Sequence, residues 1–127
     1  MDAPRHEGGC ACGAVRYAVS GEPLRVGLCH CLTCRRKHGA AFNCFVVYEQ
    51  GRFEVSGETS VWASSGVGRR HSCAVCASPV YMVDEGGDEV ELHVGGFDDV
   101  GAFAPSYEIW TRSREPWLPS LGLELRS

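Results

Sequence analysis

The 127-residue sequence lacks several features that mark special classes of protein. It has no hydrophobic run of transmembrane length, and its first residues, MDAPRHEGG, lack the apolar stretch of a secretory signal peptide. It also has no excess of positive charge, because 12 Lys and Arg stand against 16 Asp and Glu and the net charge is -4. Such a balance does not suit a binder of nucleic acid or anionic membranes. We therefore expect a cytoplasmic protein with neither partner.

Internal repeats, low-complexity stretches and linker-like segments are also missing from the sequence. The composition is that of an ordinary globular protein, with 44% hydrophobic and 22% charged residues, which excludes the disordered and fibrous classes. A chain of this length buries one modest core but not two. We therefore predict a single domain over residues 1–127.

Cysteine, by contrast, is plentiful, with eight residues. In a reducing compartment disulfides rarely persist, so closely spaced cysteines there favour metal ligands or catalytic groups. The even count alone would also fit a secreted disulfide scaffold, a reading that the absence of a signal-like start disfavours. We expect metal binding.

Short runs of β-branched and aromatic residues predict a mainly β fold, either a sandwich or several coiled sheets. Turn residues such as SGEP, SSGVG and DEGGDE separate the runs. The segment Thr33–Ala40 is expected to carry a short helix, and the proline-containing tail SREPWLPSLGLELRS an irregular strap. The predicted strands are Ala14–Val19, Ala41–Tyr48, Arg52–Ser56, Ser60–Ser64, Ser78–Val83 and Glu89–Gly95.

Seven of the cysteines fall into three clusters, which read CAC, CHCLTC and CAVC. Zinc prefers four ligands in a tetrahedron, and two short pairs on separate loops supply one such set. Joining the first cluster to the last gives a closed, structural site, whose binding free energy adds to folding. Its four predicted ligands are Cys10, Cys12, Cys73 and Cys76.

The middle cluster has three thiols and no evident fourth ligand: Cys29, Cys31 and Cys34. Catalytic zinc typically keeps three protein ligands and one open position, and an open position beside three sulfurs favours another thiolate. Zinc with three thiolates has a formal charge of about -1. The basic residues that follow, Arg35, Arg36 and Lys37, could offset this charge or hold an anionic substrate; a solvated helix face is the alternative for them.

Three further residues lie near the middle cluster in the sequence and are less favoured as metal ligands. His30 is flanked by ligands on both sides, a geometry that rarely permits binding of the same ion, so we expect a hydrogen-bonded or exposed side chain. His38 is a candidate for the fourth ligand if its segment is helical, but a solvated position on the surface is favoured. Cys44 has no partner at metal-binding spacing and is expected to be a buried apolar cysteine.

Taken together, GGCACGAVRY, CHCLTCRRKHGAAF, CAVCASPVY and the late YEIW with Trp117 resemble the glutathione-dependent formaldehyde-activating enzyme family, which includes centromere protein V. The resemblance covers roughly Gly8 to Trp117. It implies a mainly β fold of several coiled antiparallel sheets around zinc knuckles, shared with the mammalian-suppressor-of-Sec-four family. It also implies two zinc ions per chain: a structural one on Cys10, Cys12, Cys73 and Cys76, and a catalytic one on Cys29, Cys31 and Cys34.

The activity implied by the resemblance is that of a carbon–sulfur lyase, which forms or cleaves S-hydroxymethylglutathione from formaldehyde and glutathione. In this reading an open zinc binds the thiol as thiolate, and Arg35 and Arg36 orient the carboxylates of the tripeptide. Because the addition also proceeds without an enzyme, another thiol adduct stays open as the substrate. A homo-oligomer also stays open.

The sequence departs from the family pattern at two positions. Ala77 stands where the family usually has glycine, so the loop is expected to adjust at some cost if that position has a positive φ. Glu108 stands where the family tends to have histidine, a change expected to affect the substrate pocket.

Two other classes of function compete with the enzyme. One is a non-catalytic zinc module that binds a protein partner, in which a fourth protein ligand closes the middle site. The other is a redox switch in which Cys31 and Cys34 alternate between dithiol and disulfide.

Overall fold

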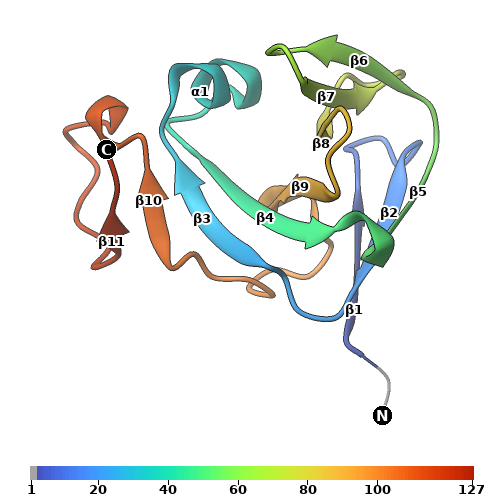
Figure 1. Ribbon diagram of the computed structural model, residues 1–127, viewed down its shortest axis with the longest axis horizontal. Helices are drawn as coiled ribbons and strands as arrows, with labels where there is room; N and C mark the ends of the chain where they lie inside the picture. The colour runs from blue at the N-terminus through green and yellow to red at the C-terminus, as the bar shows by residue number, and fades with distance from the viewer. Residues whose placement is uncertain (1–2) are drawn as a thin grey trace.

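The computed structural model describes residues 3–127, which form two β-sheets and one short α-helix (Figure 1). Three single-turn 3-10 helices interrupt the strands, at Gln50–Arg52, Val94–Gly96 and Thr111–Ser113. The strands are β1 (Arg5–Gly9), β2 (Arg16–Ser20), β3 (Arg25–Cys29), β4 (Asn43–Glu49), β5 (Phe53–Ser56), β6 (Thr59–Ala63), β7 (Gly68–Cys73), β8 (Pro79–Asp84), β9 (Glu89–His93), β10 (Tyr107–Ile109) and β11 (Glu124–Leu125). The helix α1 is Leu32–His38.

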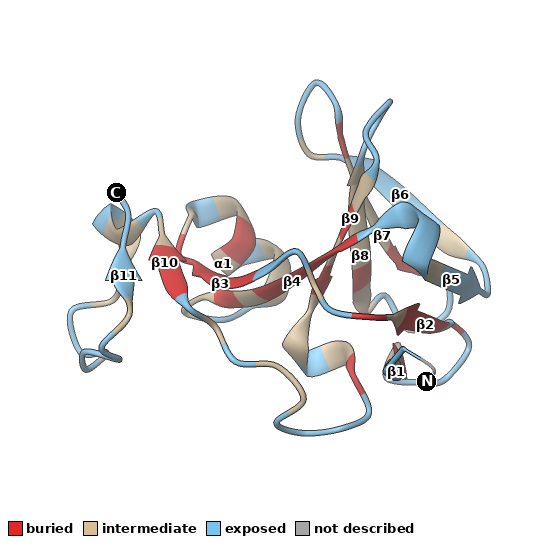
Figure 2. Ribbon diagram, turned by 60° about the horizontal axis from the view of Figure 1, so that its bottom comes forward, coloured by how far each residue is buried: buried red, intermediate tan, exposed pale blue. Residues whose placement is uncertain are grey.

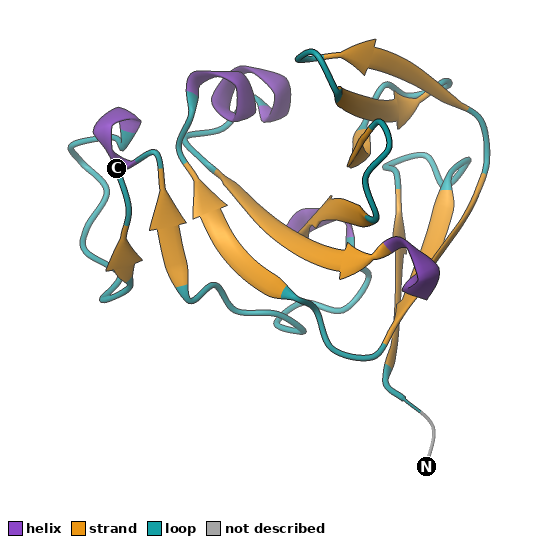
Figure 3. Cartoon of the chain, in the orientation of Figure 1, coloured by secondary structure: helices purple, strands orange, loops and turns teal. Residues whose placement is uncertain are grey.

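The larger sheet has eight strands in the order β11-β10-β3-β4-β9-β8-β7-β6, and the smaller one has three in the order β1-β2-β5. Most neighbours are antiparallel; among the described strands only β10 pairs in parallel, with β3 on one side and β11 on the other. Figure 3 shows the large sheet curving from the C-terminal strands round to β6 and β7. The prediction of a mainly β fold is therefore confirmed at the level of class; the structure has two sheets, one of them mixed, where several antiparallel sheets were expected.

Each of the six strands predicted from apolar and aromatic runs is present, with boundaries that differ by at most two residues. Five strands lack such a signal in the sequence. For example, β7 reads GRRHSC, whose three large basic side chains do not form an apolar alternation. The parallel strand β10 has only three residues. Tertiary pairing therefore forms strands that local propensity does not indicate.

Two clusters of buried side chains form the core, and the strands that carry them are red in Figure 2. The main cluster joins both sheets and includes Val15, Val46, Tyr48 and Leu92. The second lies beneath α1 and includes Phe45 and Tyr107. It also contains two of the middle-cluster cysteines, so those thiols are packed into apolar surroundings.

The helix α1 begins and ends with recognisable caps. Cys31 is its N-cap residue, and its sulfur accepts a hydrogen bond from the backbone N–H of Cys34 at 3.3 Å. Gly39 ends the helix in the left-handed region at φ 59°, where glycine is favoured. The predicted helix over Thr33–Ala40 is thus confirmed in type and shifted in its bounds.

The C-terminal tail was expected to be an irregular strap, but β11 pairs with β10 and extends the large sheet at this edge. Residues 3–127 contain no helix that is both long and apolar enough to span a membrane.

Candidate metal centres

The first candidate centre lies where two turns meet. Cys10 and Cys12 occupy the turn between β1 and β2, whereas Cys73 ends β7 and Cys76 lies in the turn before β8. A hydrogen bond from the Ala11 N–H to Ser78 Oγ, at 3.1 Å, also links the two turns. Sheet pairing holds both turns, so the structure brings the two predicted pairs together.

The four sulfurs have the spacing of a tetrahedral site. All lie within 4.8 Å of one another, with 3.6 Å between Cys10 and Cys12 and 3.8 Å between Cys12 and Cys73. A zinc–sulfur bond of about 2.3 Å gives tetrahedral sulfur–sulfur distances of about 3.8 Å. Hydrogen bonding by Ser78 lowers the pKa of Cys76 to about 5, which favours the thiolate form that metals bind. The donor set therefore fits a closed zinc site.

The loop at Cys76 has the backbone conformation for which the family usually has glycine. Ala77 lies at φ 65°, in the left-handed region, and its N–H donates to the carbonyl of Cys73. An alanine there costs about 1–2 kcal/mol relative to the right-handed region. The loop thus keeps the positive φ and bears the strain.

The second candidate centre is built from one continuous segment. Cys29 ends β3, Cys31 caps α1 and Cys34 lies in its first turn. The three sulfurs lie within 4.8 Å of one another, and no fourth Cys, His, Asp or Glu joins them in the part of the chain that is described. Two of the three residues are buried, with exposures of 6% for Cys29 and 4% for Cys34. The donor set fits a soft metal ion with one position left open.

A cation that the sequence did not indicate lies against this cluster. Arg70, on β7, places Nη2 3.8 Å from the sulfur of Cys34. A hydrogen bond from Cys29, and to a lesser extent those from Cys31 and Arg70, lower the pKa of Cys34 to about 5. The same sharing of a proton, together with burial, raises the pKa of Cys29. One thiolate is thus already favoured in the cluster at neutral pH.

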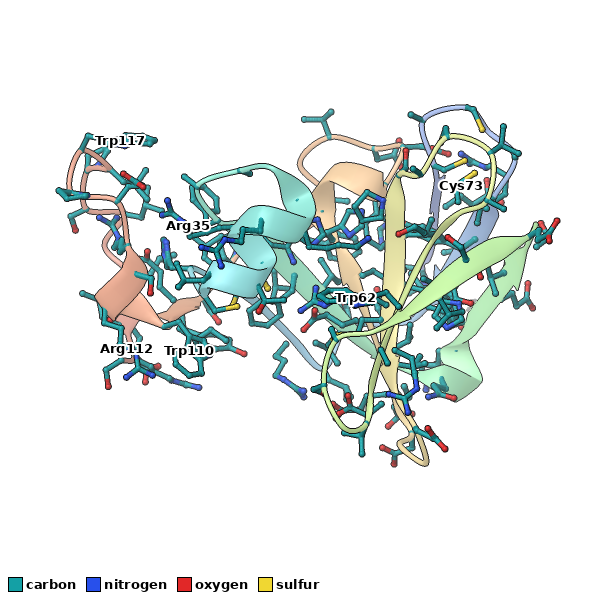
Figure 4. All side chains as sticks on the ribbon, turned by 90° about the horizontal axis from the view of Figure 1, so that it is seen from above. Arg35, Trp62, Cys73, Trp110, Arg112 and Trp117 are labelled. Atoms are coloured by element: carbon teal, nitrogen blue, oxygen red, sulfur yellow. The ribbon has the colours of Figure 1, made fainter. Side chains whose placement is uncertain are left out.

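The basic residues after the cluster take separate roles. Arg35 forms an ion pair with Glu115 at 2.5 Å and donates to the carbonyl of Ser113, which fixes the tail to the helix. Lys37 donates to Ser72 Oγ at 2.9 Å. Arg36 is exposed, and its side chain has no ion pair or hydrogen bond among residues 3–127. Arg35 and Arg36 line an open groove of about 480 Å³ between α1 and Trp117. Figure 4 shows Arg35 and Trp117 at the end of the molecule opposite Cys73.

His30 is not part of either cluster. Its side chain is completely buried and its Nε2 lies 2.8 Å from Glu108 Oε1, which also accepts a hydrogen bond from Arg114 Nε at 2.9 Å. The remaining Arg114 nitrogens donate to the carbonyls of Leu118 and Pro119. This network joins the cysteine loop to β10 and the tail. Of the two roles expected for His30, hydrogen bonding is confirmed and exposure is wrong.

Glu108 stands where the resembled family tends to have histidine, and its side chain is buried and hydrogen-bonded to His30 and Arg114. Burial raises its pKa, but hydrogen bonds from Arg114 and His30 outweigh this and hold the pKa below its usual value. An ionised carboxylate therefore stands between two donors.

A small cavity lies beside Arg70, between α1 and strands β7, β8 and β9. Its volume is about 20 Å³, which is room for one or two water molecules. The titratable residues that line it are Lys37, His38, Arg70, His71, Tyr81, Glu91 and His93.

Burial shifts several of these groups. It lowers the pKa of His38 to about 4, with the nearby His93 adding to the effect; the two rings lie 5.0 Å apart. Burial, and the charge of Cys34, raise the pKa of Glu91 to about 7. His38 is thus partly buried rather than at the surface, and it lines this cavity instead of joining the cysteines.

Cys44 lies on β4, partly buried against the main core, and burial raises the pKa of its thiol to about 11. It is therefore protonated at neutral pH. The prediction of an unreactive thiol is therefore confirmed, whereas the side chain is partly rather than completely buried.

Comparison with known proteins finds relatives by sequence similarity. An uncharacterized lyase of Schizosaccharomyces pombe is 28% identical over 79 residues, which are 62% of this chain and 58% of the relative. A protein of Halomonas elongata, whose name assigns it provisionally to the glutathione-dependent formaldehyde-activating enzymes, is 32% identical over 87 residues. That match covers 61% of this chain and 55% of the relative, so the matched region spans little more than half the length of either curated protein.

A crystal structure of a Rhodobacter sphaeroides protein has a similar fold. The TM-score is 0.61 over 95% of this chain and 99% of that one, at 18% sequence identity. The similarity supports the fold alone.

The model of the glutathione-dependent formaldehyde-activating enzyme family matches residues 5–113, a range that contains both cysteine clusters. This match agrees with the motifs in the sequence and with the two groups of sulfurs in the structure. The chain therefore belongs to the glutathione-dependent formaldehyde-activating enzyme family.

Proposed function

We propose that this protein is a zinc-dependent carbon–sulfur lyase that forms or cleaves the adduct of formaldehyde with glutathione or a related thiol. The observation that carries the proposal is the contrast between a saturated set of four sulfurs and an unsaturated set of three. We further propose that residues 1–127 act as a single zinc-binding domain with the fold of the mammalian-suppressor-of-Sec-four family, and that the protein works in the cytoplasm.

The proposed roles follow the two donor sets. Cys10, Cys12, Cys73 and Cys76 hold a structural zinc, and Cys29, Cys31 and Cys34 hold a second one. When bound at the second site, zinc supplies Lewis acidity that keeps a substrate thiol deprotonated at neutral pH. The apolar packing of Cys29 and Cys34 excludes water from one side of that site.

The groove along α1 is the proposed place for the rest of the thiol substrate. Its volume of about 480 Å³ lies in the range of small-molecule sites, and Leu32, which lines it, directly follows the half-buried Cys31. Arg36 offers an unpaired guanidinium for a substrate carboxylate, whereas Arg35 acts by holding Glu115 and the tail in place.

Cobalt substitution under reducing conditions tests the proposal. We expect two cobalt ions per chain, and one tetrahedral spectrum that changes on addition of glutathione and again on addition of formaldehyde. The variant Cys29→Ser should keep one ion and lose both responses. A wild-type spectrum that ignores both compounds, together with loss of one ion in Cys29→Ser, would instead favour a closed, non-catalytic zinc module.

A further inference from the structure

The small cavity beside the three-cysteine cluster contains a hydrogen-bond donor that the protein leaves unused. Arg70 lines the cavity, and its Nε is buried with no partner among residues 3–127. A buried N–H without an acceptor costs about 1–3 kcal/mol, so native structures rarely keep one without a reason. A ligand oxygen in the cavity would accept this bond.

The same guanidinium connects the cavity to the sulfurs. Its Nη2 lies 3.8 Å from Cys34 Sγ, and the unpartnered Nε lies on the same edge of the planar group. Because a guanidinium is rigid and planar, the cavity begins within the width of one such group from the cluster. A small molecule in it would lie next to a thiol held at the open position.

The size and charge of the cavity restrict what it can take. Its volume of about 20 Å³ admits a group of two or three heavy atoms but not a peptide. Lys37 and Arg70 are cationic, and burial lowers the pKa values of the lining residues His38 and His93, which keeps both neutral at pH 7. Glu91 is the single acid among the lining residues, and its raised pKa of about 7 weakens its negative charge. The surroundings favour an oxygen atom that gains negative charge.

We propose that this cavity is the aldehyde subsite and that Arg70 Nε donates the hydrogen bond that stabilises the aldehyde oxygen as the thiol adds. The proposal rests on the function proposed above. The substrate sulfur, whose proton has passed to solvent, forms a bond to the carbonyl carbon. The π pair of the C=O bond moves to oxygen, Arg70 stabilises the resulting alkoxide, and a proton from water completes the hydroxymethyl group. Donors aimed at a developing oxyanion contribute about 10²–10³-fold to rate.

Arg70→Gln tests this role, with Arg69→Gln as the control, because Arg69 is the neighbouring guanidinium on β7 and does not line the cavity. After subtraction of the uncatalysed rate, we expect Arg70→Gln to lower kcat for adduct formation at least about 100-fold. The affinity of its cobalt form for glutathione should change less than about threefold, because the thiol is held elsewhere. Loss of metal or of thiol affinity with unchanged kcat would mean that Arg70 only balances the charge of Cys34, and would overturn the proposal.

A second measurement does not depend on turnover. In the zinc-loaded wild-type protein we expect formate, a one-carbon oxyanion, to shift the Nε–H resonance of Arg70 in a proton–nitrogen NMR spectrum. Butyrate, which exceeds the cavity, should not shift it. An Arg70 signal that ignores formate, or that responds equally to butyrate, would contradict the subsite. If the wild-type protein and Arg70→Gln are equally active, this inference is wrong and the proposed function stands. If the wild-type protein does not catalyse the reaction, the proposed function is wrong.

Discussion

The two cysteine clusters differ in both saturation and surroundings. One set has four sulfurs, which come from two turns, and its Cys12 is exposed. Three sulfurs from one β3–α1 segment form the other, where Cys29 and Cys34 are buried beside Arg70. Where the protein supplies every ligand, the site joins distant parts of the chain. Where it supplies three, a cation and a cavity lie beside the sulfurs, as the proposed substrate site requires.

The largest expected effect separates the two clusters by stability. Cys73→Ser should prevent folding at 37 °C, because structural zinc sites contribute apparent binding free energies of about 10–16 kcal/mol to small domains. Cys29→Ser should stay folded with one metal ion fewer, since β3 remains paired with β4 and β10. Circular dichroism with metal analysis measures both. Equal loss of structure in the two variants would remove the distinction.

The next prediction concerns how the three-cysteine loop is held without a fourth ligand. Glu108→Ala leaves His30 and Arg114 without their shared carboxylate, and breaking such a buried pair costs about 3–5 kcal/mol. Glu115→Ala, which removes the less buried ion pair with Arg35, should cost less than about 1 kcal/mol. Urea unfolding of the two variants gives the comparison; similar midpoints would show that the network does not hold the loop.

A smaller effect is expected at the cavity and depends on pH. Burial raises the pKa of Glu91 from 4.5 to about 7, so the folded state binds its proton more tightly than the unfolded state does. The free energy of unfolding should therefore fall as the pH rises from 4.5 through 7, by up to about 3 kcal/mol. Glu91→Gln should lack this fall and become relatively more stable above pH 7. Parallel pH profiles of the two proteins would refute the shift.

The smallest prediction returns to the four-cysteine cluster. Ala77→Gly should raise the free energy of unfolding by about 0.5–1 kcal/mol, because glycine relieves the left-handed strain while adding flexibility to the unfolded chain. Ala74→Gly, in the same turn, is the matched control and should not stabilise. Thermal unfolding detects the difference. A destabilised Ala77→Gly would mean that the methyl group contributes contacts that outweigh the strain.

The sequence predicts the cysteine clusters better than their surroundings. The spacing within CAC, CHCLTC and CAVC is local, and pairing of the first cluster with the last follows from the need of zinc for four ligands. The contact of Arg70 with Cys34, by contrast, spans 36 residues and depends on the register of β7, a strand without apolar alternation. The burial of His30 likewise depends on Glu108, 78 residues away. Such contacts arise from tertiary pairing, which local patterns do not encode.

The sequence separation of the cysteines also determines which cluster can form first while the chain is synthesised. Cys29, Cys31 and Cys34 lie within six residues, so an unfolded chain can offer all three thiols to a metal ion as soon as residue 34 has emerged. Cys12 and Cys73 are 61 residues apart, and closing a loop of that length costs about 3–4 kcal/mol of chain entropy. The four-cysteine cluster is therefore completed last. Under the proposed function, a nascent chain first meets zinc through the three-cysteine cluster, to which we assign the chemistry.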